Sequence, residues 1–320
     1  MSRQFSELEV LNEMFYRGLL EKGSLLEEHY YWLRSGFDGE MEMLKRLREK
    51  LFSQPNIIYD LTIELNGITQ VDFLVLWRNY WWVIEVKNYA GIFELRNNEC
   101  FLRGKELRSD QLAAMRKRMR IIRQVAQRIS SKIKVAGNFV LIHQDGELLS
   151  KIDEEFEVVT SNQVSRIIFE HGQNQILYSD HEFSEIKQVL NRYISDYPVD
   201  LPLISSDQWE KCKKGIRCQL CNSYNFTSRK KQLICNDCGN KIYKYQAAIE
   251  LYCQLSTLAH AQNELLTIKN IALLSNNLIS EETIRRALLN NVKDIYIPHR
   301  SYLKNIKMTY SRFSKIMEDN

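Results

Sequence analysis

The apolar residues of the chain recur with two different periods, which separate predicted strands from predicted helices. Alternation at every second residue, bounded by turn residues, predicts strands over residues 57–65, 69–77, 80–88, 134–143 and 156–160. Spacing of three and four residues predicts a helix over 111–129, whose inner face would hold Leu112, Met115, Met119, Ile122 and Ala126. The order of helix, three strands, helix and strand favours an α/β fold, with a mixed sheet flanked by helices.

The region before the first strand is rich in charged and aromatic residues and is predicted to be helical in two pieces. The first piece covers residues 5–34, and the glycines at positions 36 and 39 are expected to end it. The second covers residues 39–52, where Glu40 falls on the same stripe as Leu44, Leu47 and Leu51. An acid at the head of an apolar stripe is either a first-turn carboxylate, favoured by the helix dipole, or a functional group.

A two-residue turn at Arg78-Asn79 fixes how the second and third strands pair. Two acids, Asp72 and Glu85, then lie directly opposite each other, which destabilises a sheet by about 0.2–1 kcal/mol. A cation should therefore lie between them, and a divalent metal ion could take one oxygen from each, with Lys87 pointing to the same side. The alternative is a solvated Glu-Lys face on an edge hairpin. The expected pairs are Trp77–Tyr80, Val75–Trp82, Phe73–Ile84 and Val71–Val86 on one face, and Leu76–Trp81, Leu74–Val83, Asp72–Glu85 and Gln70–Lys87 on the other.

Composition and charge set wide bounds. A chain of 320 residues can form two or three domains, and its net charge of +4 permits a polyanionic partner without requiring one. No segment approaches the roughly 20 apolar residues of a membrane span, and the first residues lack the apolar core of a signal peptide. We therefore expect a cytoplasmic protein with no membrane partner. Seven cysteines in such a compartment favour metal binding over disulfides.

Two tight cysteine pairs give the most specific local signal. The pattern C-x2-C-x13-C-x2-C is typical of a structural zinc ribbon, in which four thiolates leave no position for a substrate. Cys212 is the one rival ligand nearby, and Cys100 and Cys253 are expected to be ordinary thiols. The loop that connects the two pairs could contact phosphate or could be a solvated tip. The predicted zinc ligands are Cys218, Cys221, Cys235 and Cys238, and the cations of the loop are Arg229, Lys230 and Lys231.

An acid on one strand followed by Glu85-Val86-Lys87 on the next resembles the PD-(D/E)xK nuclease pattern. More narrowly, "GE" at 39–40, "TQVD" at 69–72, "VIEVKNYAG" at 83–91 and a later Gln that heads a helix resemble the nuclease-related domain, NERD. The resemblance covers residues 36–145. It implies a restriction-endonuclease-like fold with Glu40, Asp72, Glu85 and Lys87 in the active site and with Gln70 and Gln111 near it. The chain has "RSDQ" at 108–111, where the family tends to have an Asn-Pro lead.

The function that this resemblance implies is hydrolysis of phosphodiester bonds in nucleic acid, with DNA as the expected form. Mg²⁺ or Mn²⁺ held by Asp72 and Glu85 would polarise the phosphate, Glu40 would anchor the attacking water, and Lys87 would orient it or neutralise charge. A bacterial protein is expected, and a homodimer is allowed, because many such nucleases pair to cut both strands. The cations of helix 111–129 expected to run along a nucleic-acid backbone are Arg116, Lys117, Arg120 and Arg123.

The predicted domains are an N-terminal helical segment (1–35), the nuclease-like domain (36–200), the ribbon (206–245) and a helical region (246–320). Within the last, residues 265–290 have the outline of a helix-turn-helix with Ser280 as a cap, although two packed helices of an interaction domain would look the same. Two further readings of the whole chain stay open: a nucleic-acid-binding protein that does not cleave, and a scaffold whose zinc ribbon docks a partner.

Overall fold

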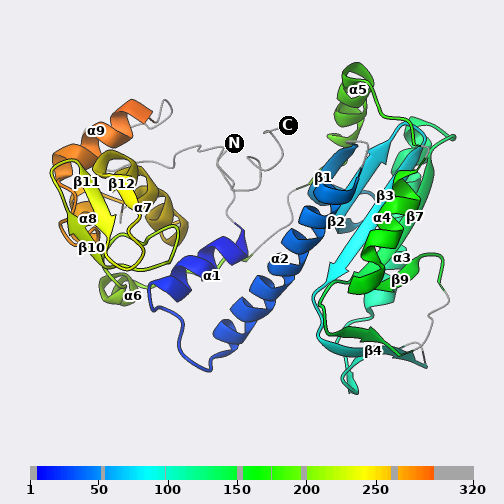
Figure 1. The fold of residues 1–320 in the computed structure, drawn as a ribbon, viewed down its shortest axis with the longest axis horizontal. Coiled ribbons are helices and arrows are strands. Elements are labelled where there is room, and N and C mark those ends of the chain that lie inside the picture. Colours follow the sequence, from blue (N-terminus) through cyan, green and yellow to red (C-terminus); the bar gives the residue numbers. More distant parts are fainter. Residues whose placement is uncertain are drawn as a thin grey trace. The chain divides into compact units, whose positions relative to one another are not determined.

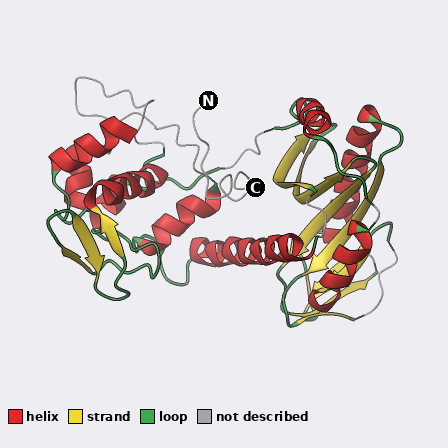
Figure 2. Cartoon of the chain, turned by 45° about the horizontal axis from the view of Figure 1, so that its top comes forward, coloured by secondary structure: helices red, strands yellow, loops and turns green. Residues whose placement is uncertain are grey.

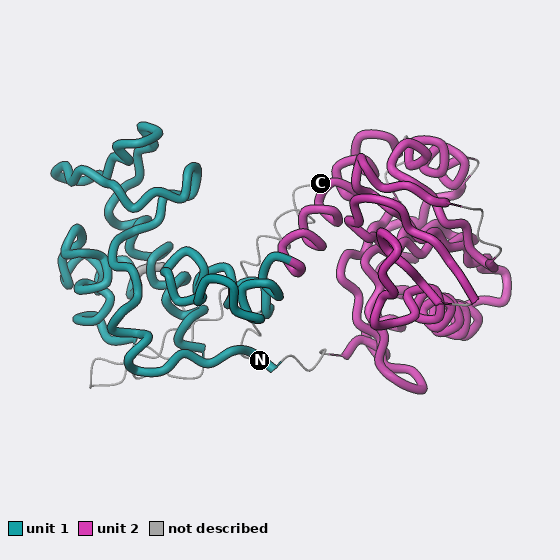
Figure 3. Tube along the Cα trace, turned by 90° about the horizontal axis from the view of Figure 1, so that it is seen from below, with its two compact units in different colours: residues 1–31, 199–320 teal, residues 32–198 magenta. Residues whose placement is uncertain are grey.

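The computed structural model describes residues 6–51, 55–97, 99–149, 154–173, 175–195, 200–260 and 266–291. Two compact units divide the chain (Figure 3): unit 1 consists of Met1–Tyr31 with Val199–Asn320, and unit 2 of Trp32–Pro198. Among the helices described, none is both long enough and apolar enough to cross a membrane. The end of the predicted helical region, residues 292–320, lies outside the described residues.

Unit 2 is built on a mixed five-stranded sheet in the order β1-β2-β3-β7-β9 (Figure 1). The first three strands pair antiparallel, and β3, β7 and β9 pair parallel. The α/β fold predicted from the apolar pattern is therefore confirmed, and each predicted strand is present with ends that differ by at most two residues. The strands are β1 (Asn56–Glu64), β2 (Ile68–Trp77), β3 (Tyr80–Lys87), β7 (Lys134–Leu141) and β9 (Glu157–Thr160).

Helices cover both faces of this sheet (Figure 1). The predicted amphipathic helix is α3 (Gln111–Ile129), and its Met115 and Met119 are buried in one cluster with Leu74 and Trp81 of the sheet. On the other face lies α4 (Val164–Gly172), preceded by a 3₁₀ turn at Ser161–Gln163. The two hairpin strands therefore bury apolar side chains on both faces, which explains their nearly continuous apolar sequence.

A second, four-stranded sheet in the order β6-β5-β4-β8 fills the segment that shows no regular pattern. Its strands are too short for alternation to be recognised, and β4 pairs with β8 across more than 50 residues of sequence. Unit 2 also contains α5 (Asp180–Leu190), which begins with a capping box between Ser179 and Glu182. The strands are β4 (Gly91–Arg96), β5 (Glu99–Leu102), β6 (Lys105–Glu106) and β8 (Gly146–Leu148).

The prediction that glycines 36 and 39 end a helix is wrong. Both lie inside α2 (Leu25–Lys50), and the break falls earlier, after α1 (Glu7–Tyr16), where Gly18 and Gly23 adopt positive φ. A Cβ atom at position 39 would lie 2.7 Å from Asn88 Cβ and 2.9 Å from Ile142 Cγ2. Gly39 is therefore needed for the close approach of α2 to the sheet, and packing outweighs its low helix propensity.

Unit 1 combines a three-stranded ribbon with helices, and the ribbon strands lie beside α7 (Figure 2). The predicted helix-turn-helix outline is present as α8 and α9, with Ser280 Oγ accepting a hydrogen bond from Thr283 N (3.3 Å) and with positive φ at Asn276 and Asn277. The elements are β10 (Phe226–Ser228), β11 (Gln232–Cys235), β12 (Lys241–Tyr243), α6 (Ser206–Lys211), α7 (Lys244–Leu258), α8 (Ile268–Leu274) and α9 (Glu281–Asn291).

A buried polar network holds the N-terminal helix within unit 1. Arg17 is 1% exposed and donates hydrogen bonds to the carbonyl oxygens of Lys213 (2.9 Å) and Gly215 (3.2 Å) and to Gln254 Oε1 (3.1 Å). Arg217 pairs with Glu13 of α1, and both are buried. Breaking a buried charge pair by removing one partner costs about 3–5 kcal/mol, so these contacts tie α1 to the ribbon.

Candidate active site

The β2–β3 hairpin has the predicted register over most of its length. Pairing runs from Trp77–Tyr80 back to Phe73–Ile84. The expected Val71–Val86, Asp72–Glu85 and Gln70–Lys87 pairs are absent from the ladder between these two described strands. Instead, Asp72 Oδ2 accepts a hydrogen bond from the backbone N–H of Val86 at 2.7 Å. The acids therefore lie where the two strands part, and a carboxylate satisfies an N–H group that a regular ladder would pair with backbone.

Strand β1 is irregular at Asp60, the position opposite Asp72 of β2. Asp60 has φ +54°, and the β1–β2 pairing passes from Tyr59–Phe73 to Leu61–Val71 without it. Val71 belongs to the same buried cluster as Leu74, although strict alternation would place these two residues on opposite faces. The alternation is therefore interrupted around Asp72, and this interruption removes the basis for placing Gln70 beside the acids.

Gln70 accordingly lies differently from the expectation. Its side chain is exposed and donates a hydrogen bond to Asp60, while its carbonyl oxygen accepts one from Arg118 Nε at 2.6 Å. Gln111, at the start of α3, donates to Ser109 Oγ at 2.5 Å. The hydrogen bonds of both amides are thus with neighbours outside the acid cluster, and their roles in catalysis stay predictions.

Glu85 is the most deeply buried acid of the site, at 1% exposure. Its Oε1 lies 2.7 Å from Lys87 Nζ, so the two charged residues of the Glu-Val-Lys motif form an ion pair along one strand. Its Oε2 lies 3.0 Å from Arg118 Nε, but the N–H of that atom donates to the Gln70 carbonyl instead. Glu85 Oε2 is consequently buried without a hydrogen bond.

Glu40 reaches the site from α2. Its Oε2 accepts a hydrogen bond of 2.5 Å from the Tyr59 hydroxyl. Burial raises the pKa of Glu40 to about 7, and the Tyr59 hydrogen bond only partly opposes this. The charges of Lys87 and Glu85 also act on its pKa, so Glu40 lies within electrostatic reach of both. A stripe of buried leucines, as predicted, positions this part of α2, and its members are Leu44, Leu47 and Leu51.

The pKa values of Asp72 and Lys87 are both raised, which favours the neutral form of the acid and the charged form of the lysine. Burial, together with the Glu85 carboxylate, raises the pKa of Asp72 well above its ordinary value. Burial alone would lower the pKa of Lys87, but the Glu85 and Asp72 carboxylates outweigh it, so the pKa of Lys87 is raised and the ammonium stays charged. The cluster therefore disfavours two ionised acids in the absence of a further positive charge.

These residues fit a divalent cation. Asp72 and Glu85 offer oxygen ligands, the kind that Mg²⁺ prefers, and Glu85 Oε2 is a buried acceptor without a hydrogen bond. Mg²⁺ is commonly held by one or two protein carboxylates, with waters and substrate phosphates completing its shell. Two acids are thus sufficient for such a site.

Arg118 is a site residue that the sequence reasoning missed. Its side chain is only 17% exposed and lies against Glu85 and Gln70. The signal was available, since Arg118 follows Gln111 by seven residues and therefore falls on the same helix face two turns later.

The four α3 cations predicted to bind nucleic acid share one surface. They line an open pocket of about 630 Å³ together with Gln124, Gln127 and Glu155. Most have internal partners, because Arg116 pairs with Glu154, Arg123 with Glu155, and Lys117 Nζ donates to the Ile68 carbonyl at 3.0 Å. We call this set the α3 basic surface; its members are Arg116, Lys117, Arg120 and Arg123.

The four cysteines of the ribbon gather as the spacing predicts. All four Sγ atoms lie within 4.8 Å of one another, with 3.6 Å between those of Cys218 and Cys238. Zinc bound tetrahedrally at about 2.3 Å separates its sulfur ligands by roughly 3.8 Å, so the cluster fits zinc. Burial would raise the pKa of Cys218, but hydrogen bonds from the backbone around Cys221 lower it to about 6. Despite a backbone hydrogen bond that lowers it, the pKa of Cys238 is raised by desolvation and by hydrogen bonds with Cys218 and Cys235. Cys212 is buried outside the cluster.

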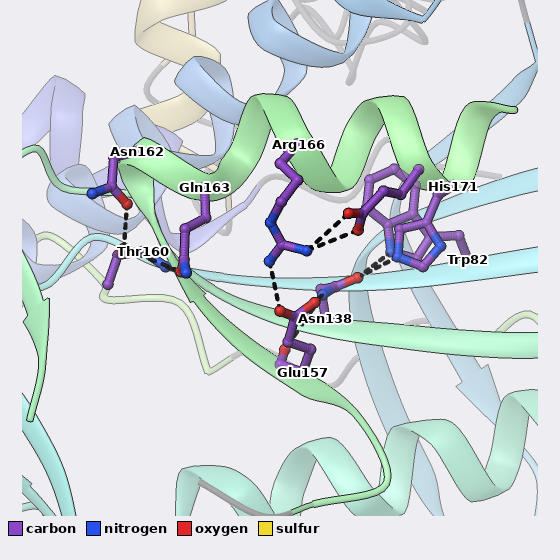
Figure 4. A network of polar contacts seen from close by, with 9 residues as sticks. Trp82, Asn138, Glu157, Thr160, Asn162, Gln163, Arg166 and His171 are labelled. Atoms are coloured by element: carbon purple, nitrogen blue, oxygen red, sulfur yellow. Dashed lines mark hydrogen bonds and ion pairs between the residues drawn. The ribbon is translucent and has the colours of Figure 1, made fainter. Parts of the chain in front are cut away.

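A second polar network lies on the α4 face of the sheet (Figure 4). Asn138 Oδ1 accepts hydrogen bonds from Trp82 Nε1 and His171 Nε2, both at 2.8 Å, and the Tyr80 hydroxyl contacts His171 Nδ1 at 2.5 Å. Burial lowers the pKa of His171 to about 4, so the ring is neutral near pH 7. The contacts of His171 are with groups of the chain itself, and they hold α4 against the sheet.

Residues 35–142 match the family model of the nuclease-related domain, NERD. Comparison with curated proteins and comparison with solved structures gave no match. The matched segment contains Glu40 and the strands β1, β2, β3 and β7, that is, the elements that carry the acids and their neighbouring strand. Residues 35–142 are thus similar to the nuclease-related domain, and a four-cysteine cluster compatible with a zinc ribbon follows them in the chain.

Proposed function

We propose that the chain is a nuclease that uses Mg²⁺ or Mn²⁺ to hydrolyse phosphodiester bonds, with DNA as its substrate. One observation carries the proposal: where β2 and β3 part, Asp72 accepts a hydrogen bond from the amide of Val86, the residue after the buried Glu85, and Glu85 Oε2 lacks a hydrogen bond. This is an arrangement that a divalent cation would complete. The matched nuclease-related domain supports the same reading.

The roles follow from the contacts of each side chain. Asp72 and Glu85 would hold the ion, which would polarise the phosphate and lower the pKa of the attacking water. Glu40, fixed by the Tyr59 hydroxyl, would anchor that water. Lys87 carries its charge beside Glu85 and would neutralise charge that develops on the phosphate. Arg118 holds the Gln70 carbonyl and thereby the edge of the site.

Two surfaces would bring nucleic acid to this site. The α3 basic surface belongs to the same unit as the acids, and the tip of the ribbon adds Arg229, Lys230 and Lys231. Cations that neutralise phosphates supply affinity without reading the sequence. A cytoplasmic location, structural zinc in the ribbon and pairing of two chains to cut both strands belong to the same proposal.

The test is cleavage by the purified chain with its zinc retained. Linear, circular and branched DNA and RNA would be incubated with Mg²⁺ or Mn²⁺ beside Asp72→Asn and Glu85→Gln, which keep side-chain volume and remove charge. Glu147→Gln, an exposed acid of β8, is the matched control. We expect cleavage by the wild type and by the control, and none by the two site variants. Cleavage that survives both substitutions would overturn the proposal.

A second candidate, a nucleic-acid-binding protein that does not cleave, is favoured by one observation. Lys87 forms an ion pair with Glu85, and Arg118 lies 3.0 Å from it, so the chain already partly neutralises this acid. If wild type and both site variants bind nucleic acid with equal affinity and none cuts under any metal condition, this second function replaces the first.

A further inference from the structure

The zinc ribbon presents two sheet faces, and among the described residues α7 packs on one of them. Leu233 and Ile242 pair across the ladder and point to one side, where α7 packs on β11 and β12. Residues at alternate positions point to the other side. By this register, the outer face holds Thr227, Gln232, Ile234, Lys241 and Tyr243.

Tyr243 is the aromatic side chain of this outer face, and it is 59% exposed. No described residue forms a hydrogen bond with its hydroxyl group or a ring contact with it. A large aromatic side chain on a small sheet is usually buried or paired, because its burial stabilises a fold by about 1.5–3 kcal/mol. The ring of Tyr243 thus offers a flat surface to solvent.

Cations stand two residues before and one residue after Tyr243 in the chain, at Lys241 and Lys244. The backbone N–H of Lys244 donates to the Lys231 carbonyl at 3.0 Å, which brings the ribbon tip beside the end of β12. None of the five cations between residues 226 and 244 forms an ion pair with a described residue, and the one acid of that range, Asp237, accepts a hydrogen bond from Asn225. The five are Arg229, Lys230, Lys231, Lys241 and Lys244.

We infer that this outer face binds single-stranded nucleic acid, with a base stacked on Tyr243 and phosphates against the ribbon-tip cations. The outer face and the five cations of residues 226–244 are together called the ribbon face below. An exposed ring stacks on bases only where they are unpaired, because a duplex hides the flat surfaces of its bases. The unpaired positive charge of the face complements a polyanion. The inference rests on the proposal that the chain acts on nucleic acid, but it does not depend on cleavage.

The test measures binding without added Mg²⁺, so that no substrate is cut. Fluorescence anisotropy of the full chain with zinc retained would be recorded with a labelled 20-nucleotide oligo(dT) and with a labelled 20-base-pair duplex. The variants are Tyr243→Ala, Tyr243→Phe and Tyr243→Leu, the last keeping apolar bulk without an aromatic ring. Phe169→Ala, an aromatic of α4 that is 52% exposed, is the matched control. Zinc content and thermal unfolding of every variant report on folding.

The Ala and Leu variants should weaken binding to the single strand by about tenfold, within a range of roughly 5- to 100-fold for loss of one stacked base. The Phe variant, the control variant and all duplex affinities should be unchanged. Equal losses on both nucleic acids, or no loss with Ala and Leu, would overturn the inference and leave the proposed nuclease standing. A wild-type chain that binds neither nucleic acid would overturn both.

Discussion

The α3 basic surface and the ribbon face carry similar numbers of cations but differ in how those charges are used. On α3, Arg116 and Arg123 form ion pairs with acids of the loop before β9, and Lys117 donates to a backbone carbonyl. On the ribbon face, none of the cations forms an ion pair with a described residue. A count of Lys and Arg therefore overstates the free charge of α3 relative to that of the ribbon.

Zinc removal should give the largest effect, because it should unfold the ribbon and abolish binding at the ribbon face. Structural zinc contributes on the order of 10 kcal/mol to small domains, so Cys235→Ser should lose the metal and the folded ribbon. Single-strand binding should fall with it, while the thermal transition of unit 2 stays. Metal analysis and calorimetry check this. Cys253→Ser, outside the cluster, is the control; a Cys235→Ser chain that keeps zinc and binding would contradict the prediction.

His171 should lower the stability of unit 2 in acid, and the ribbon contains no histidine that could do the same. His171 is held neutral, with a pKa of about 4 against about 6.5 when unfolded. The unfolded chain binds the extra proton first, so the contribution of His171 to stability is complete above pH 6.5 and falls, by up to about 3 kcal/mol, as the pH drops to 4. The raised pKa of Glu40 acts in the opposite sense, so the contribution of His171 is the difference between the wild type and a variant without it. Thermal unfolding of unit 2 across this range checks it. His171→Phe should unfold more easily at pH 7 but lose much of this pH dependence; an unchanged slope in that variant would show that another group is responsible.

Freeing the α3 cations should make that surface resemble the ribbon face. Glu154→Gln with Glu155→Gln removes the main acid partners of Arg116 and Arg123. Nucleic-acid affinity should rise several-fold, and the salt dependence should steepen by about one to two counterions. Arg116 keeps a contact with Asp110 at 3.3 Å, which limits the gain. Titrations at several salt concentrations measure this, with Glu147→Gln as control. Unchanged affinity and salt slope would mean that α3 does not contact nucleic acid.

The smallest expected effect is the difference in salt dependence between variants that each lose one cation, from the ribbon face or from the α3 basic surface. Lys230→Ala removes an unpaired charge and should weaken binding uniformly across sequences, lowering the salt slope by about 0.7–0.9. Arg123→Ala removes a charge already paired with Glu155 and should change the slope less. Anisotropy titrations of the two variants on one oligonucleotide test the difference. A larger change for Arg123 would reverse the comparison drawn here.

Sequence reasoning succeeded where short-range pattern decides the structure. Alternation and the two-residue turn placed the hairpin pairs from Trp77–Tyr80 to Phe73–Ile84, and cysteine spacing placed the four sulfurs together. It failed beyond Phe73 because alternation assumes a continuous ladder. There Asp60 turns to positive φ and the Asp72 side chain replaces a backbone partner, and neither event has a local signature.

Other misses share a long-range cause. Gly39 reads as a helix end, but its role is set by Asn88 and Ile142, about 50 and 100 residues away. The partners that compensate Arg116 and Arg123 lie 38 and 32 residues later in the chain. Arg118 could have been predicted as a site residue, because its spacing of seven residues from Gln111 places both on one face of α3. Contacts made in three dimensions, and not residue type, decide which charges are free.

The hydrogen bond from the Val86 amide to Asp72 has a consequence for ion selectivity. With Oδ2 already accepting a backbone hydrogen bond, Oδ1 is the oxygen that Asp72 would offer most readily to a cation. Ca²⁺ reaches six to eight ligands and often takes both oxygens of a carboxylate, whereas Mg²⁺ needs six in an octahedron at about 2.1 Å. One amide of the sheet would thus limit the coordination number of the site and favour the smaller ion.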